Sequence, residues 1–108
     1  MSAIEITQSN FQEEVLHAGK PVLLDFWARW CNPCRMVGPI VDEVAAQCPD
    51  VKVGKVNIEQ QPELAKRFQI ASIPTLLVLQ NGQVIRQASG AMAKGEILAM
   101  LEPVRRTR

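Results

Sequence analysis

The sequence predicts an α/β protein built on one mixed β-sheet with helices on both faces. Apolar runs such as "PVLLDFWA" (21–28) alternate with stretches whose apolar residues recur every three to four positions. That alternation is typical of parallel strands separated by helices. Near the end, Asn81-Gly82 stands between two apolar runs, a strong signal for a β-hairpin. Because the 108 residues are 47% hydrophobic and 21% charged, we expect residues 1–108 to form a single domain.

The first elements are a weak strand and a capped helix. Residues 3–7 are a short strand candidate. Ser9 is the expected N-cap of the helix that follows, with Gln12 completing a capping box and Gly19 ending the helix. The run at 21–28 is nearly all apolar, which predicts a strand buried on both faces.

A long helix is predicted after the two cysteines of "WCNPC". Its apolar stripe follows a 3-4-3-4 spacing through Cys34, Val37, Val41, Val44 and Cys48. Pro39 lies inside this helix and is expected to bend it. Residues 50–58 form the next strand, and Pro62 opens a short helix.

The last elements are the hairpin and a final helix. We expect this helix to run from Ala93 to about Glu102, with Pro103 limiting it. The predicted order is therefore βαβαβαββα. Helices between the early strands imply parallel crossovers, and the hairpin adds an antiparallel edge.

Composition and charge argue against several classes of protein. A formal net charge of +1 gives no general attraction to nucleic acid or to an anionic membrane. No run approaches the ~18 apolar residues of a membrane span, and the N-terminal stretch has no secretory pattern. The basic ending "RRTR" (105–108) is expected to be a solvated tail. With only three cysteines, the chain is expected to be cytoplasmic, where a C-x-x-C pair is more often catalytic or metal-binding than structural.

The cysteine pair falls where the strand hands over to the long helix. Cys31 is expected in or just before the first turn, where unpaired N–H groups favour a thiolate, and Pro33 is tolerated there. Cys34 continues the buried stripe. We therefore expect one exposed, activated sulfur and one shielded sulfur within reach, the asymmetry that thiol–disulfide exchange uses.

Other uses of the pair are less favoured. Zinc usually needs four ligands, and only Cys48 and His17 remain, each at the far end of its own helix. A structural disulfide closing so short a loop would stabilise the fold little. Cys48 itself is expected to be a buried, inert residue, with a regulatory thiol as the minority reading.

Two charged residues stand in predicted strands. Asp25 interrupts an apolar run, and burial would make it a proton acceptor near neutral pH. Lys55 shares a strand face with Val51 and Val53, so it needs a partner, and Asp25 is the expected one. The alternative for each is a strand-end charge that reaches solvent.

Three segments resemble the thioredoxin family, and together they cover nearly the whole chain. They are "DFWARWCNPCRMVGP", "VGKVNIEQQPELAKRFQIASIPTLL" and "NGQVIRQASGAM". The resemblance implies the thioredoxin fold, a five-stranded mixed sheet flanked by four helices. It makes Cys31 the nucleophile and Cys34 the resolving thiol. Asp25, with Lys55 beside it, would assist deprotonation of Cys34, and Trp27 would pack beneath the dithiol.

The resemblance also implies a docking surface and partners. Ile73-Pro74 would be a cis peptide whose backbone pairs with an extended substrate. The implied substrate-binding residues are Trp30, Asn32, Pro33, Ile73, Pro74, Gly90 and Ala91. The implied reaction is reduction of protein disulfides by a monomer, which a flavin- and NADPH-dependent thioredoxin reductase then re-reduces. No cofactor is expected on the chain itself.

This sequence departs from the family's usual W-C-G-P-C motif. Asn32 replaces the glycine, Arg29 stands where many members carry an acidic or neutral residue, and Arg35 lies one turn past Cys31. All three changes are expected to favour the Cys31 thiolate and so make the dithiol more oxidising. Two other functions stay open: a redox-independent scaffold with this fold, and an oxidase or isomerase, which the lack of an export signal disfavours.

Overall fold

The computed structural model describes residues 3–105. The elements run in the order β1 (Ile4–Glu5), π-helix η1 (Gln12–Leu16), β2 (Val22–Trp27), α1 (Asn32–Gln47), β3 (Lys52–Asn57), α2 (Pro62–Arg67), β4 (Thr75–Gln80), β5 (Gln83–Ser89) and α3 (Lys94–Arg105). The expected order βαβαβαββα is confirmed. Most of the tail at 105–108 lies outside the described residues.

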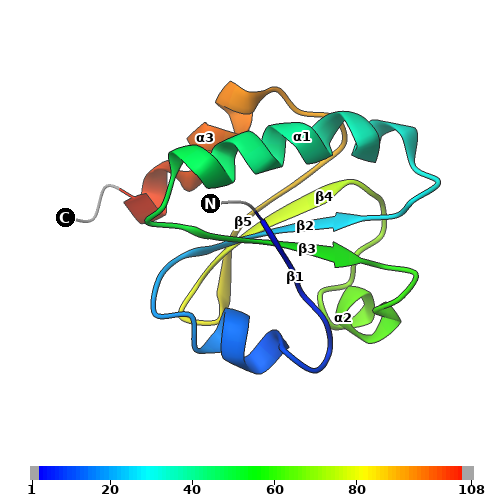
Figure 1. The fold of residues 1–108 in the computed structure, drawn as a ribbon, viewed down its shortest axis with the longest axis horizontal. Coiled ribbons are helices and arrows are strands. Elements are labelled where there is room, and N and C mark those ends of the chain that lie inside the picture. Colours follow the sequence, from blue (N-terminus) through cyan, green and yellow to red (C-terminus); the bar gives the residue numbers. More distant parts are fainter. Residues whose placement is uncertain (1–2, 106–108) are drawn as a thin grey trace.

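The strands form one mixed sheet in the order β1-β3-β2-β4-β5. β3 pairs in parallel with β1 and β2, whereas β4 pairs antiparallel with β2 and β5. Helices α1 and α3 cover one face of this sheet, and η1 and α2 lie on the other (Figure 1). The prediction of a five-stranded mixed sheet flanked by four helices is therefore confirmed for the described part of the chain.

Each face of the sheet packs its own hydrophobic core. Strand β2 serves both, because Leu23 belongs to the cluster that contains Val41 and Ile97, and Leu24 belongs to the cluster that contains Phe11. Alternate strand residues point to opposite faces, which explains why "PVLLDFWA" is almost continuously apolar. Each such fully buried side chain contributes about 1.5–3 kcal/mol of burial free energy. A central strand that is buried on both faces therefore leads toward the cysteine pair.

The hairpin between β4 and β5 turns at Asn81-Gly82, as expected. Asn81 has φ 54° and Gly82 has φ 79°. Positive φ at both central residues is what a two-residue hairpin turn requires, and Asn and Gly are the residues that adopt it most readily.

The sequence misplaced the start of the first helix. Thr7 and Asn10 make the reciprocal bonds expected of Ser9 and Gln12: the Thr7 N–H donates to Asn10 Oδ1 at 2.7 Å, and the Asn10 N–H donates to Thr7 Oγ1 at 3.2 Å. The helix that follows is a π-helix, because the His17 N–H bonds the Gln12 carbonyl five residues back. The Thr7–Asn10 bonds thus close the turn before the helix, Ser9 lies inside that turn, and the N-cap of η1 is Phe11, which makes no side-chain capping bond.

Pro103 does not end the last helix. Helix α3 continues through it to Arg105. Although proline removes one backbone hydrogen bond, Leu101 is fully buried and Val104 is 4% exposed. Packing of these two side chains into the core holds the last turn in place. None of the helices between residues 3 and 105 is long and apolar enough to cross a membrane.

Candidate active site

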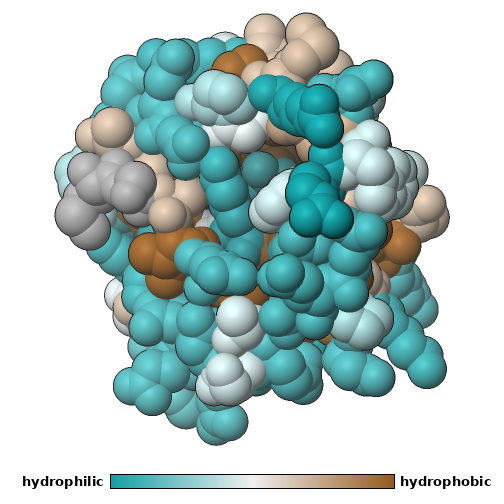
Figure 2. All heavy atoms as spheres, turned by 45° about the vertical axis from the view of Figure 1, so that its right-hand side comes forward, coloured by the Kyte–Doolittle hydropathy of each residue, from teal (hydrophilic) through white to brown (hydrophobic). Residues whose placement is uncertain are grey.

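The two cysteines of "WCNPC" lie at the junction of β2 and α1, at the end of the molecule that is turned forward in Figure 2. Cys31 and Cys34 are joined by a disulfide, with their Cα atoms 5.3 Å apart. Cys31 is the N-cap of α1, and its Sγ accepts a hydrogen bond from the Cys34 N–H at 3.2 Å. Pro33 occupies the first turn, where its missing N–H costs nothing. When the pair is reduced, this N–H and the helix dipole favour negative charge on the Cys31 sulfur.

Both cysteines are shielded, contrary to the expectation that Cys31 is exposed. In the disulfide form Cys31 is 4% exposed and Cys34 is 5% exposed. Trp27, Ile58 and Ile73 pack against the pair. The two sulfurs differ in their hydrogen bonding at the helix N-terminus rather than in their exposure. The position of Trp27 against the dithiol agrees with the sequence prediction.

An apolar hollow lies next to Ile58 and Ile73, two of the side chains that pack against the disulfide. Its volume is about 340 Å³. The residues that line it are Trp30, Ile58, Ile70, Ala71, Ser72 and Ile73. Trp30 is 63% exposed, which is unusual for a large aromatic side chain and leaves its ring free for a partner.

The Ile73-Pro74 peptide bond is cis, which confirms the prediction. The Gly90 N–H donates to the Pro74 carbonyl at 2.9 Å, so the segment after β5 is tied to this bond. Gly90 has φ +92°, a conformation that side-chain-bearing residues rarely adopt. Ala91 is exposed next to it. Pro74 and Gly90 are therefore joined next to Ile73, which packs against the cysteines.

Asn32 is exposed in the first turn of α1. Within residues 3–105 its amide forms no hydrogen bond to either sulfur of the disulfide. The expected bond to a Cys31 thiolate concerns the reduced state, so it stays a prediction.

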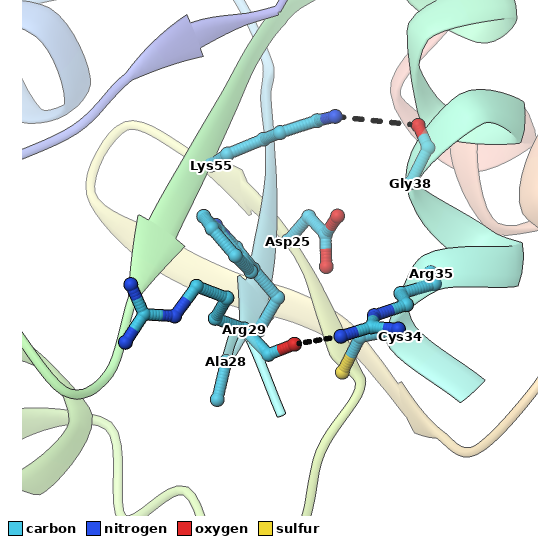
Figure 3. Close-up of a pocket in the computed structure, with 8 residues that line it drawn as sticks. Asp25, Ala28, Arg29, Cys34, Arg35, Gly38 and Lys55 are labelled. Carbon is cyan, nitrogen blue, oxygen red and sulfur yellow. Dashed lines mark hydrogen bonds between the residues drawn. The ribbon is translucent and has the colours of Figure 1, made fainter. Parts of the chain in front are cut away.

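A second cavity lies behind Cys34, with a volume of about 250 Å³. Figure 3 shows the residues that line it, which are Asp25, Trp27, Ala28, Arg29, Cys34, Arg35, Gly38 and Lys55. Asp25 is only 1% exposed, and among the described residues its Oδ1 has no hydrogen-bond partner. A buried acid and the inner cysteine thus face the same space.

The protonation of Asp25 follows from its surroundings. Burial raises the pKa of the Asp25 carboxyl from its ordinary 3.8 to about 6. The positive charge of Lys55 opposes this rise, and the negative charge of Asp42 adds to it. Near neutral pH the carboxylate is the main form, yet it takes up a proton readily.

Lys55 does not pair with Asp25, although the two residues are direct partners in the register of β2 and β3. Its Nζ forms an ion pair with Asp42 Oδ1 at 3.1 Å and donates to the Gly38 carbonyl at 3.3 Å. The expectation of an Asp25 partner was wrong because helix α1 offers a half-exposed carboxylate. Pairing there costs less desolvation than pairing with a fully buried one.

Asp42 is the residue of this site that sequence reasoning missed. Gly38 and Asp42 are four residues apart on a helix, so they share one face. That spacing was the available signal. It could not be used without knowing which face of α1 passes over β3.

Two arginines border the same cavity. Arg35 Nη2 donates to the Arg29 carbonyl at 3.0 Å and so ties the first turns of α1 to the loop that precedes Cys31 (Figure 3). Both arginines are exposed. The local positive charge expected from the sequence is therefore present beside the dithiol.

Cys48 lies apart from the dithiol, at the C-terminal end of α1. It is 1% exposed and belongs to the core cluster under α1 and α3. Arg105 Nη1 donates to its Sγ at 3.1 Å. Within residues 3–105 no group of three or more His, Cys, Asp or Glu side chains is placed to hold a metal.

A C-x-x-C pair that caps a helix beside a cis-proline, on a mixed sheet of this order, defines a thiol–disulfide oxidoreductase. Comparison with known proteins agrees, since the family model described as Thioredoxin matches residues 2–103. A "Thioredoxin" of Mycobacterium bovis is 41% identical over 104 residues, covering 95% of this chain and 90% of its own. "Thioredoxin 1" of Nostoc sp. is 46% identical over 102 residues, covering 94% and 95%. The chain belongs to the thioredoxin family.

One relative is a longer protein. The "Bifunctional thioredoxin reductase/thioredoxin" of Mycobacterium leprae is 43% identical over 102 residues. The match covers 94% of this chain but only 22% of that protein.

Proposed function

We propose that this chain is a protein-disulfide reductase that passes electrons from Cys31 and Cys34 to disulfide-containing target proteins. The observation that supports it most is the hydrogen bond from the Cys34 N–H to Cys31 Sγ at the N-terminus of α1. The same arrangement favours a thiolate at Cys31 once the pair is reduced, and a thiolate is the attacking species in disulfide exchange.

The reaction has two exchange steps. Cys31 Sγ attacks one sulfur of the target disulfide, so that a Cys31–target bond forms and the second target sulfur leaves as a thiolate. Cys34 then loses its proton and attacks Cys31 Sγ. The Cys31–Cys34 bond forms, the first target sulfur leaves as a thiolate, and two electrons have moved to the target.

Asp25 takes the proton of Cys34 in the second step. Its pKa of about 6 lies closer to neutrality than that of an ordinary carboxyl, which makes it a better proton acceptor. The cavity that both residues line has a volume of about 250 Å³. That volume exceeds the roughly 30 Å³ share of one liquid water, so a water can carry the proton between them. Lys55 acts on this step through its charge.

The target docks as an extended segment on the surface around the disulfide. Ile73 offers backbone next to Pro74 and Gly90, whose own carbonyl and N–H already bond each other, and Ala91 and Trp30 offer apolar contact. Asn32 and Pro33 border the attacking sulfur. Backbone beside an aromatic surface suits recognition of extended peptides.

The oxidised chain is re-reduced by a flavin- and NADPH-dependent thioredoxin reductase. The name of the Mycobacterium leprae relative joins a thioredoxin reductase and a thioredoxin in one protein, which supports this pairing. In this proposal the chain works as a monomer and a single domain, in the cytoplasm, without a cofactor of its own.

The test is NADPH consumption in the presence of a bacterial thioredoxin reductase and a protein disulfide. Wild type is expected to sustain turnover, and Cys31→Ser is expected to abolish it. Cys48→Ser is the matched control, because Cys48 is buried away from the dithiol, and it should retain turnover. No turnover by wild type would refute the proposal. A partner-dependent function that survives in the Cys31→Ser, Cys34→Ser double variant would favour the scaffold alternative.

A further inference from the structure

Helix α1 provides the acceptors that hold the positively charged amino group of Lys55. The Lys55 amino group contacts Asp42 Oδ1 at 3.1 Å, Asp42 Oδ2 at 3.2 Å and the Gly38 carbonyl at 3.3 Å. All three acceptors belong to α1. Figure 3 shows the Lys55 side chain reaching across the cavity to Gly38, with the Asp25 carboxyl group below it on the side of Cys34.

The register of the sheet would allow another arrangement. Asp25 and Lys55 are directly opposite each other on β2 and β3, and their side chains line the same cavity. An ammonium group that turned from α1 toward Asp25 would give that acid a direct cationic partner. In the structure, Asp25 Oδ1 instead has no hydrogen bond to any described residue.

We propose that Asp42 is a positioning residue, which holds the Lys55 amino group on helix α1 and thereby leaves the buried acid Asp25 free to accept the proton of Cys34. Asp42 acts in two ways. It draws the cation away from Asp25, and its own negative charge disfavours a second negative charge nearby. Both effects make Asp25 a stronger base.

The other charged groups around Asp25, which are two arginines, do not have the effect on its pKa that Asp42 and Lys55 have. Arg35, on α1, directs a guanidinium N–H to the carbonyl of Arg29 in the loop. Both arginines are exposed, so solvent screens them from the buried acid. Among residues 3–105, Lys55 on β3 and Asp42 on α1 are the charges that shift the pKa of Asp25.

The inference rests on the proton transfer proposed above, in which the Cys34 S–H proton moves to an Asp25 oxygen. The electron pair left on Cys34 Sγ forms the bond to Cys31, and the target leaves as a thiolate. A carboxylate already neutralised by a direct ammonium partner is a weaker base, so this step becomes slower. Asp42 thus controls the rate of the resolving step without touching a reacting atom.

The test is a ¹³C NMR titration of the Asp25 carboxyl group in the oxidised protein. Asp42→Asn is expected to increase the ionisation constant of Asp25 about two- to fivefold, the range that an exposed ion pair supports. Glu43→Gln is the matched control. Glu43 is the next residue on α1, and it pairs with Lys94 at 3.3 Å rather than with Lys55. Its loss should leave the titration of Asp25 unchanged.

The same change in a Lys55→Gln background separates the two effects of Asp42. There Asp42→Asn should act more weakly, because no ammonium remains to be released. An unchanged or higher pKa of Asp25 in Asp42→Asn, or an equal effect of Glu43→Gln, would overturn the inference. Asp42 is half-exposed, so its variant is expected to fold, and urea unfolding checks this.

A second readout distinguishes the inference from the proposed function. In Asp42→Asn, the pH at which release of a target from the Cys31 mixed disulfide becomes half-maximal should fall together with the Asp25 titration. If the titration moves and the release profile does not, the role proposed for Asp25 in the reaction is wrong. If neither moves, Asp42 is not a positioning residue.

Discussion

Replacing Asp25 with Asn measures how much the buried carboxylate lowers the free energy of unfolding. The pKa of Asp25 is about 6 in the folded protein, against an ordinary 3.8. The folded state therefore holds this proton more tightly than the unfolded state, and stability falls as the pH rises from about 4 to about 6. The two values differ by roughly 2, and one pKa unit corresponds to 1.36 kcal/mol, so the total loss is about 3 kcal/mol.

The assay is urea unfolding of the oxidised wild type and of Asp25→Asn across this pH range. The amide carries no charge at any of these pH values, and the other ionisable groups contribute about equally to both proteins. From pH 4 to 7.5, the free energy of unfolding of the variant should rise relative to wild type by about 2–3 kcal/mol. A buried amide without a partner lowers the free energy of unfolding of the variant by about 1–3 kcal/mol at every pH. This penalty shifts the difference between the two proteins by a constant and does not change how that difference depends on pH.

A flat difference between the two proteins over this range would refute the reasoning. It would mean that Asp25 has an ordinary pKa in the folded state. A wild type that gains stability relative to the variant as the pH rises would place a cation directly on Asp25, contrary to the contacts of Lys55 on α1.

Three further predictions concern other parts of the molecule. Asn32→Gly should slow alkylation of the reduced Cys31 at neutral pH and make the dithiol more reducing. The potential should fall by about 30 mV for each 1.4 kcal/mol of lost thiolate stabilisation. An unchanged alkylation rate and potential would contradict this prediction. Cys48 should be alkylated only as the protein unfolds, because it is 1% exposed, whereas rapid labelling of the native protein would show a reactive thiol. Gly54→Ala should lower the free energy of unfolding by about 1–3 kcal/mol in urea titration, since an added methyl group would clash with Ile6; wild-type stability would contradict it.

Much of the fold could be predicted because its signals are local. A continuous apolar run marks the central strand β2, a two-residue Asn-Gly turn marks the hairpin, and a 3-4-3-4 stripe marks α1. Where local signals competed, the sequence misled. Ser9 was the expected N-cap, but the reciprocal bonds form between Thr7 and Asn10 in the preceding turn, and the N-cap is Phe11. Pro103 should end a helix, but two buried neighbours keep α3 intact.

The site was predicted less completely, since part of it depends on how elements pack. The positions of Cys31 and Cys34 on α1 follow from their spacing. The shielding of Cys31 does not, because it comes from side chains far along the chain, such as Ile73. The choice of Asp42 as the partner of Lys55 depends on which face of α1 lies over β3, and strand parity carries no information about that.

The most direct measurement of the central claim is to trap the mixed disulfide. The reduced Cys34→Ser variant keeps the attacking thiol and lacks the resolving one. Mixed with a protein disulfide, it should form a stable covalent adduct through Cys31 that a small thiol reductant reverses, as seen by mass spectrometry and peptide mapping. Cys31→Ser should form no such adduct at a comparable rate. An adduct through Cys34, or none with either variant, would contradict a reductase in which Cys31 attacks and Cys34 resolves.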